Sequence, residues 1–352
     1  MAYTGVDNSS EYFNTVTYTG DGSADQSITG LGFKPDFLWI KRRNASERHV
    51  LTNPQYPVVS GAYRWDDSAD SVSAFGGGTG VAAFDTDGFT IKTSDATWNA
   101  NGSTYVFWSW LGSGATPASN TQGGTRNVTL SANQTAGFCT FRLLGGLDNT
   151  STGHGLGVAP DVVLIKRENA SVGFYVYHKD IGTEKYLLLG SHAVVASQAD
   201  SFSAAPTSTL FTGGLNIINS TDWFNGYCFA EKQGYSKFGS FLANANADGP
   251  FVYTGFKPAW ILRKATARAE PWMLMDNKRT PINPLGTILD PSSNAGDAVT
   301  PGDYRMDLLS NGFKIRSGNT SYGNHTSGVK YIYMAFAENP FVTSTGIPAT
   351  AN

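Results

Sequence analysis

The stretch GFKPDFLWIK at residues 32–41 decides the fold, because the chain repeats it twice more. The second copy is GVAPDVVLIK at 157–166, and the third is GFKPAWILRK at 255–264. In each copy a glycine and a proline interrupt the preceding segment, and proline favours an extended entry. The apolar run that follows is too short for a helix and rich in β-branched and aromatic residues. We therefore predict three equivalent strands, each covered on both faces until its final lysine reaches water.

Two further patterns recur in step with this stretch. A glycine turn followed by a short strand appears as DGFTI at 87–91, GGLNI at 213–217 and NGFKI at 311–315. Its glycine follows the proline of the first pattern by 53, 54 and 54 residues. An aromatic strand then closes each copy: YVFWSW at 105–110, GYCFAE at 226–231 and YIYMAFAE at 331–338. The spacing predicts three homologous units of roughly 100 residues.

Short strands separated by turn clusters dominate the chain, and no amphipathic helix of three turns is evident. This pattern is typical of antiparallel β-sandwiches, so we predict an all-β protein of three tandem β-sandwich repeats. The predicted units are residues 1–114, 115–235 and 236–352. Residues 112–137 are almost entirely small or polar, and we expect a linker there with at most one strand, near residues 127–130.

Composition excludes several classes of protein. The net charge is −3 and only 15% of the residues are charged, which argues against a nucleic-acid footprint of clustered Lys and Arg. The N-terminus lacks the basic and apolar segments of a signal peptide, and no apolar run is long enough to span a membrane. Cys139 and Cys228 each lie within an apolar strand pattern, which favours buried free thiols over a disulfide.

The usual signs of catalysis or cofactor binding are weak. No Gly-x-Ser-x-Gly segment is present, and the glycine run at 76–80 lacks the lysine of a phosphate-binding loop. The five histidines are not at metal-ligand spacing. We expect His49 and His178 to occupy related positions in two strands, which favours packing in the sheets over metal coordination. We predict no metal and no cofactor.

Carboxylates are the remaining catalytic candidates. Glu231 and Glu338 recur at the same place in two units, which favours an architectural role over a unique acid pair. Asp85 and Asp87 resemble the start of a calcium loop, but the further ligands and the closing glutamate are missing. The sequence therefore indicates a protein that is not an enzyme.

Tryptophans in or beside turn-like segments are the best candidates for binding. An exposed indole face can stack on a sugar ring or anchor a protein interface, whereas the alternative is that these rings cover the ends of the sandwiches. Polar neighbours of the tryptophans would supply hydrogen bonds to a glycan. The candidate ligand-binding residues are Trp65, Asp66, Trp98, Trp223, Asn225 and Trp272.

Several of these segments resemble a family of tailed-phage proteins described as tail-fibre-like or virion structural proteins. The resemblance rests on TYTG at 17–20, the repeated Gly-x-x-Pro pattern, VYHK at 176–179, YCFAEKQGYSKFG at 227–239 and MAFAENPF at 334–341. It covers nearly the whole chain, apart from TNPQYP at 52–57, and implies concanavalin- or jelly-roll-like sandwich repeats. It implies no catalytic residues.

The resemblance implies a non-enzymatic virion protein, made in the host cytoplasm, that contacts other tail or capsid proteins. We expect a homo-oligomer without membrane insertion or a nucleic-acid partner. The leading hypothesis is a tail fibre or adhesin whose loops bind a host-surface glycan, since repeated weak sites gain avidity. The alternative is a capsid decoration or cement protein, in which three tandem units imitate a trimer. A polysaccharide depolymerase is a third and weaker hypothesis, because no acid pair is evident.

Overall fold

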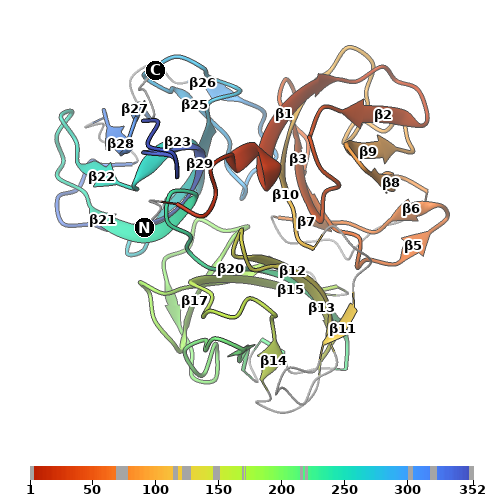
Figure 1. Ribbon diagram of the computed structural model, residues 1–352, viewed down its shortest axis with the longest axis horizontal. Coiled ribbons are helices and arrows are strands. Elements are labelled where there is room, and N and C mark those ends of the chain that lie inside the picture. The colour runs from red at the N-terminus through yellow and green to blue at the C-terminus, as the bar shows by residue number, and fades with distance from the viewer. Residues whose placement is uncertain are drawn as a thin grey trace.

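The computed structural model describes residues 4–68, 78–113, 118–120, 128–145, 151–168, 170, 172–214, 217–218, 221–299, 304–317 and 323–348. Within these ranges all strand pairs are antiparallel, and the helical content is one turn of 3₁₀ helix, η1 (Ser9–Glu11). The protein is therefore all-β, as predicted. Figure 1 shows three lobes arranged around a common centre.

Lobe 1, red to orange in Figure 1, contains a large and a small sheet. The large sheet has the order β1 (Phe13–Thr19), β10 (Thr104–Trp110), β3 (Phe37–Arg42), β4 (His49–Thr52) and β7 (Asp66–Asp67). The small sheet has the order β2 (Gln26–Thr29), β9 (Gly88–Ile91) and β8 (Val81–Asp85). A short hairpin joins β5 (Val58–Val59) to β6 (Ala62–Tyr63).

Lobe 2, yellow to green in Figure 1, is built on the sheet with the most strands among the described residues. Its order is β11 (Ala118–Asn120), β12 (Val128–Asn133), β13 (Phe138–Leu144), β20 (Trp223–Phe229), β15 (Val162–Arg167), β16 (Tyr175–His178), β17 (Lys185–Leu188) and β18 (Ala196–Ser197). A second pair joins β14 (Thr152–Gly153) to β19 (Leu210–Phe211). The linker prediction was wrong, because this segment supplies both β11 and β12 to the sheet; residues 114–117 and 121–127 lie outside the described ranges.

Lobe 3, cyan to blue, again has one large and one small sheet. The large sheet has the order β21 (Ser236–Leu242), β29 (Lys330–Pro340), β23 (Phe256–Ala265) and β24 (Met273–Asp276). The small sheet has the order β22 (Phe251–Tyr253), β28 (Gly312–Ile315) and β27 (Met306–Leu309). A further pair joins β25 (Thr287–Ile288) to β26 (Ala298–Val299).

The three large sheets share a four-strand arrangement. The orders β1-β10-β3-β4, β13-β20-β15-β16 and β21-β29-β23-β24 each place the closing aromatic strand beside the strand of the repeated proline motif. The registers also correspond, since Trp39 pairs with Trp108, Leu164 with Tyr227 and Leu262 with Met334. His49 pairs with Lys41 but His178 pairs with Val162, so the two histidines do not occupy related positions and that prediction was wrong.

The repeated motif explains how each strand enters its sheet. Its first glycine, at positions 32, 157 and 255, has φ angles of +89°, +72° and +81°. Residues with a side chain rarely adopt this left-handed backbone conformation, which explains why glycine occupies the position. Successive residues of the following strand then face opposite sides of the sheet, and both sides are buried.

Each large sheet packs on two cores. Its outer face lies against the other strands of its own lobe, as Ile40 does with Phe89 in lobe 1. Its inner face contributes to one central cluster that joins all three lobes. Trp39, Trp110, Leu164, Phe229, Leu262 and Phe336 are members of this central cluster.

The lysine that ends each repeated motif is buried, not exposed. Lys41, Lys166 and Lys264 each have 0% of their surface accessible, so the prediction that they reach water was wrong. Burial lowers the pKa of Lys41 and of Lys264 to about 8. Each ammonium instead donates to a carbonyl of the next lobe: Lys41 to Asn294 (3.1 Å), Lys166 to Asp67 (2.8 Å) and Lys264 to His192 (3.1 Å). The three contacts run in one cyclic direction around the centre.

A second set of polar contacts also joins the lobes in pairs. Asn53 of lobe 1 donates to the Tyr227 hydroxyl of lobe 2 at 3.2 Å. The His178 Nε2–H of lobe 2 donates to the carbonyl of Tyr333 in lobe 3 at 3.2 Å. The Trp108 indole of lobe 1 donates to Asp276 of lobe 3 at 3.2 Å. These buried hydrogen bonds fix the lobes relative to one another.

We expect His178 to make stability depend on pH. Burial is the main reason that the pKa of His178 falls to about 4, below its ordinary 6.5. Between these values the unfolded chain binds the proton and the folded chain does not, so stability is lost as the pH falls from 6.5 to 4. The loss should be on the order of 2–3 kcal/mol.

The measurement is the free energy of unfolding at several pH values between 4 and 7 for the native protein and for His178→Gln. Glutamine retains a donor towards Tyr333 but does not titrate. The variant should therefore show a shallower pH dependence. Identical slopes for the two proteins would contradict a role for His178.

Candidate functional site

The tryptophans named from the sequence have different environments. Seven of the eight tryptophans are buried, including Trp65, Trp98 and Trp272. Trp65 and Trp98 pack edge to face at 5.8 Å in lobe 1. The Trp272 indole donates to the carbonyl of Leu188 at 2.9 Å, between lobes 3 and 2. None of these three rings has the exposed face that stacking on a sugar requires, because another segment covers each of them.

The two polar candidates are also buried. Asp66 accepts a hydrogen bond from the Tyr56 hydroxyl, and its carboxylate lies 3.9 Å from the Lys166 ammonium. Burial raises the pKa of Asp66 to about 7. Asn225 has 0% of its surface exposed and donates to Glu168. These two side chains therefore support the fold and do not face a ligand directly.

Trp223 is the exposed tryptophan, with 39% of its surface accessible. It begins β20 and pairs across the sheet with Leu144, which is also exposed. The corresponding positions of the other lobes are Thr104, paired with Thr19, and Lys330, paired with Leu242. At this position of the sheet, the exposed aromatic ring is therefore specific to lobe 2.

Arg142 and Glu168 hold the Trp223 ring in place. The Arg142 guanidinium lies 3.9 Å from the ring centre, in cation–π contact with one face. Arg142 in turn forms two hydrogen bonds, of 2.5 and 3.0 Å, to the buried Glu168 carboxylate, to which Asn225 also donates. The Trp223 amide carbonyl accepts from the Glu168 N–H at 2.9 Å. These contacts hold the indole in place, and part of its surface stays accessible.

A second charged pair lies on the other face of the sheet, because Arg167 pairs with Phe224, the residue after Trp223. Arg167 donates to Asp222 at 2.5 Å, and both side chains are about one-third exposed. We call Trp223, Leu144 and Arg142 the Trp223 surface. It combines an exposed aromatic ring with an apolar side chain and a guanidinium, which suits a sugar ring or the centre of a protein interface.

The sequence alone identified only part of this surface. Trp223 and Asn225 were predicted from their turn-like segment, whereas Arg142, Glu168 and Leu144 were not. Arg142 and Leu144 alternate on β13, which is a signal for one face of a strand. No pattern in the sequence of β13 itself indicates that this strand lies beside β20.

The two recurring glutamates have partners within the fold. Glu231 forms ion pairs with Lys179 (3.1 Å) and Lys237, and Glu338 pairs with Lys257 (3.0 Å). These contacts agree with the predicted architectural role.

Asp87, from the calcium-like segment, accepts hydrogen bonds from the N–H groups of Gly32 (2.6 Å) and Gly30 (3.0 Å), which lower its pKa. It therefore closes a turn of lobe 1. In the part of the chain that the structure describes, no group of three His, Cys, Asp or Glu side chains could hold a metal ion. Cys139 and Cys228 are buried free thiols, as predicted.

The described residues include no helix that could span a bilayer. Comparison with curated proteins gave no match, and comparison with solved structures gave none either. A family match covers residues 8–340, which include strands of all three lobes. The chain thus belongs to the family described as Domain of unknown function (DUF7483).

Proposed function

We propose that this protein is a non-enzymatic structural protein of a phage particle, a tail fibre or adhesin that binds a host-surface glycan through the Trp223 surface. The observation that carries the proposal is the exposed Trp223 ring, held on Arg142 and Glu168 at the beginning of β20, a central strand of the broad sheet. A ring fixed before binding loses little conformational freedom when a ligand stacks on it. The resemblance of the repeated motifs to tail-fibre-like proteins is the reason that we propose a phage particle.

The same proposal includes three tandem β-sandwich repeats of concanavalin- or jelly-roll-like type, at residues 1–114, 115–235 and 236–352. The shared four-strand order supports this interpretation. So do the three apolar clusters in which each large sheet buries its outer face within its own lobe. Rigid repeats of this kind suit the display of surface loops.

A capsid decoration or cement protein is the second candidate. It is favoured by the cyclic contacts of Lys41, Lys166 and Lys264, through which one chain imitates a closed trimer. Such a body could occupy a site with threefold symmetry on a head. Labelling of whole particles with an antibody separates the candidates, since an adhesin should be found at the tail and a decoration protein over the head.

Replacement of Trp223 by alanine should weaken binding to host-surface glycans at least about tenfold, because an aromatic anchor at the centre of a site commonly contributes 2 kcal/mol or more. Binding is measured with the full-length protein on immobilised host polysaccharide. Tyr253→Ala is the matched control, since Tyr253 is an exposed aromatic residue on lobe 3. The control should bind like the native protein.

Equal binding by Trp223→Ala and the native protein would remove the Trp223 surface from the proposal. Cleavage of the polysaccharide by the native protein would instead support the depolymerase hypothesis and contradict a non-enzymatic role.

A further inference from the structure

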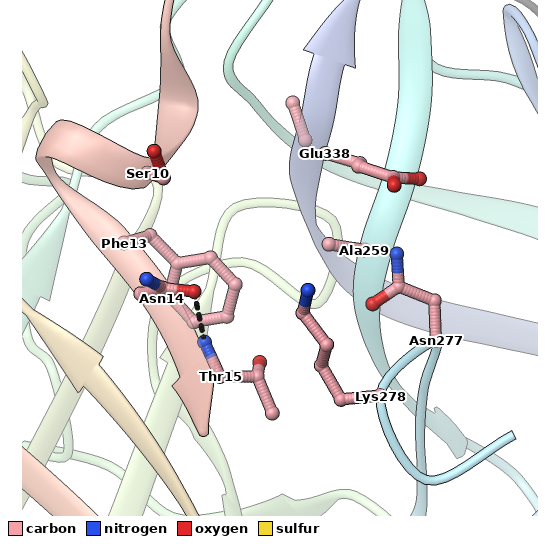
Figure 2. Close-up of a pocket in the computed structure, with 9 residues that line it drawn as sticks. Ser10, Phe13, Asn14, Thr15, Ala259, Asn277, Lys278 and Glu338 are labelled. Atoms are coloured by element: carbon pink, nitrogen blue, oxygen red, sulfur yellow. Dashed lines mark hydrogen bonds between the residues drawn. The ribbon is translucent and has the colours of Figure 1, made fainter. Parts of the chain in front are cut away.

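A small cavity lies between lobes 1 and 3 (Figure 2). It has a volume of about 80 Å³, well above the roughly 10–15 Å³ that one water molecule requires. Lobe 1 contributes the start of β1, and lobe 3 contributes the turn after β24 and the end of β29. The residues on which the argument depends are Thr15, Asn277, Lys278 and Glu338.

The corresponding place between lobes 2 and 1 is closed by a direct hydrogen bond. There the Thr140 hydroxyl donates to Gln55 at 3.1 Å. Thr140 corresponds to Thr15, because they pair with the equivalent residues Tyr227 and Trp108.

Gln55 likewise corresponds to Lys278. Gln55 follows Thr52, the partner of Leu38, by three residues, and Lys278 follows Met275, the partner of Ile261, by three residues. The cavity therefore lies at the position where the interface between lobes 2 and 1 has the Thr140–Gln55 hydrogen bond.

Buried polar atoms line the cavity without a hydrogen-bond partner. Thr15 is 3% exposed and its Oγ1 has no partner; Asn277 is 6% exposed and its Oδ1 has none. A buried polar atom left without a partner is costly, which favours an occupant. Figure 2 shows the Lys278 ammonium pointing into the space near Asn277.

The surrounding groups define the chemistry of the occupant. Asn277 Oδ1 requires a donor, and the ammonium of Lys278, an exposed residue, can donate to an acceptor placed in the space. A cation would be repelled by Lys278, and a carboxylate could not donate to Asn277 and would approach the carboxylate of Glu338. A hydroxyl group both donates and accepts, and the apolar side chains of Phe13, Ala259 and Ala337 can contact its carbon atoms.

We propose that this cavity binds the vicinal diol of a small polyol or of a glycan end. The Thr15 hydroxyl and Asn277 hold one hydroxyl, and Lys278 donates to the other. The site is separate from the Trp223 surface in residues and lobes, and its existence does not depend on glycan binding there.

The test is saturation-transfer NMR of the full-length protein with glycerol and, separately, with a methyl glycoside that carries a free vicinal diol. The native protein should give a saturable signal with glycerol. Thr15→Val, which keeps the shape but removes the hydroxyl, should weaken the apparent affinity at least fivefold. Thr140→Val is the matched control and should leave glycerol binding unchanged, because Thr140 lies at the closed interface.

A methyl glycoside signal that depends on Thr15 would extend the site to glycan ends, and a signal from glycerol alone would identify a free polyol as the ligand. Absence of a saturable signal from both compounds would overturn the proposal and leave a cavity filled by water only. Equal affinities in the native protein and Thr15→Val would also overturn it. Trp223→Ala should retain glycerol binding, which separates this site from the proposed attachment function.

Discussion

Replacement of Trp110 by alanine should destabilise the whole protein by about 3–5 kcal/mol, the usual cost of removing a large aromatic side chain from a core. Trp110 is 1% exposed and belongs to the cluster that joins the lobes. Its ring contacts aromatic residues of every lobe: Phe13 and Phe37 (both 4.9 Å), Phe138 (6.4 Å), Phe229 (6.0 Å), Trp260 (5.7 Å) and Phe336 (5.4 Å).

Denaturant unfolding gives the loss of stability, and hydrogen exchange shows where it occurs. Protection should fall in β3, β15 and β23 together, because removal of the indole leaves a space in the core that these three strands share. Tyr253→Ala, on the surface of lobe 3, is the control and should change stability by less than about 0.5 kcal/mol. Loss of protection confined to β3 and its neighbours would contradict a shared core.

Replacement of Arg279 by alanine should cost about 3–5 kcal/mol, because it leaves the buried Asp276 carboxylate without its counter-charge. The Arg279 side chain is fully buried and donates to Asp276 (2.6 Å), Asp297 (2.9 Å) and the carbonyl of Leu274 (3.0 Å). Asp276 also accepts from Trp108 of lobe 1. The substitution therefore disturbs both lobe 3 and its contact with lobe 1.

The control for Arg279→Ala is Arg316→Ala, which removes an exposed arginine paired with Asp307 at 3.0 Å. Surface pairs contribute about 0–1 kcal/mol, so this control should unfold nearly like the native protein. The free energy of unfolding at neutral pH is the measurement. Equal losses in the two variants would mean that the buried network around Arg279 contributes no more than a surface pair.

The elements of the fold were largely predictable from the repeated patterns. The proline motif identified β3, β15 and β23, and the closing aromatic runs identified β10, β20 and β29. Both signals are local, since period and composition suffice to indicate a buried strand. The burial of Lys41, Lys166 and Lys264 was not predictable in this way, because their acceptors belong to another lobe and a terminal lysine ordinarily marks the surface.

The candidate site was predictable only in part, for a related reason. A tryptophan in a polar segment can be exposed, as Trp223 is, or covered by a distant segment, as Trp98 is by Trp65. Sequence pattern does not distinguish these cases. The support of the Trp223 ring joins Arg142 to Glu168 across 26 residues, and this contact exists only once β13, β20 and β15 lie side by side.

The three lobes are alike in strand order and different at their surfaces. Position 223 carries the exposed indole in lobe 2, and its counterparts are Thr104 and Lys330. The interfaces also differ, since Thr140 bonds directly across one of them and Thr15 faces a cavity at another. Repetition thus supplies the scaffold, and the departures from repetition supply the candidate sites.

The central claim is that the three lobes form one cooperative body around a shared core. Scanning calorimetry of the full-length protein tests it most directly, by comparing the measured enthalpy of unfolding with the van't Hoff enthalpy. We predict a single transition in which the two enthalpies agree. Two or three resolved transitions, each with the enthalpy of one lobe, would contradict the claim.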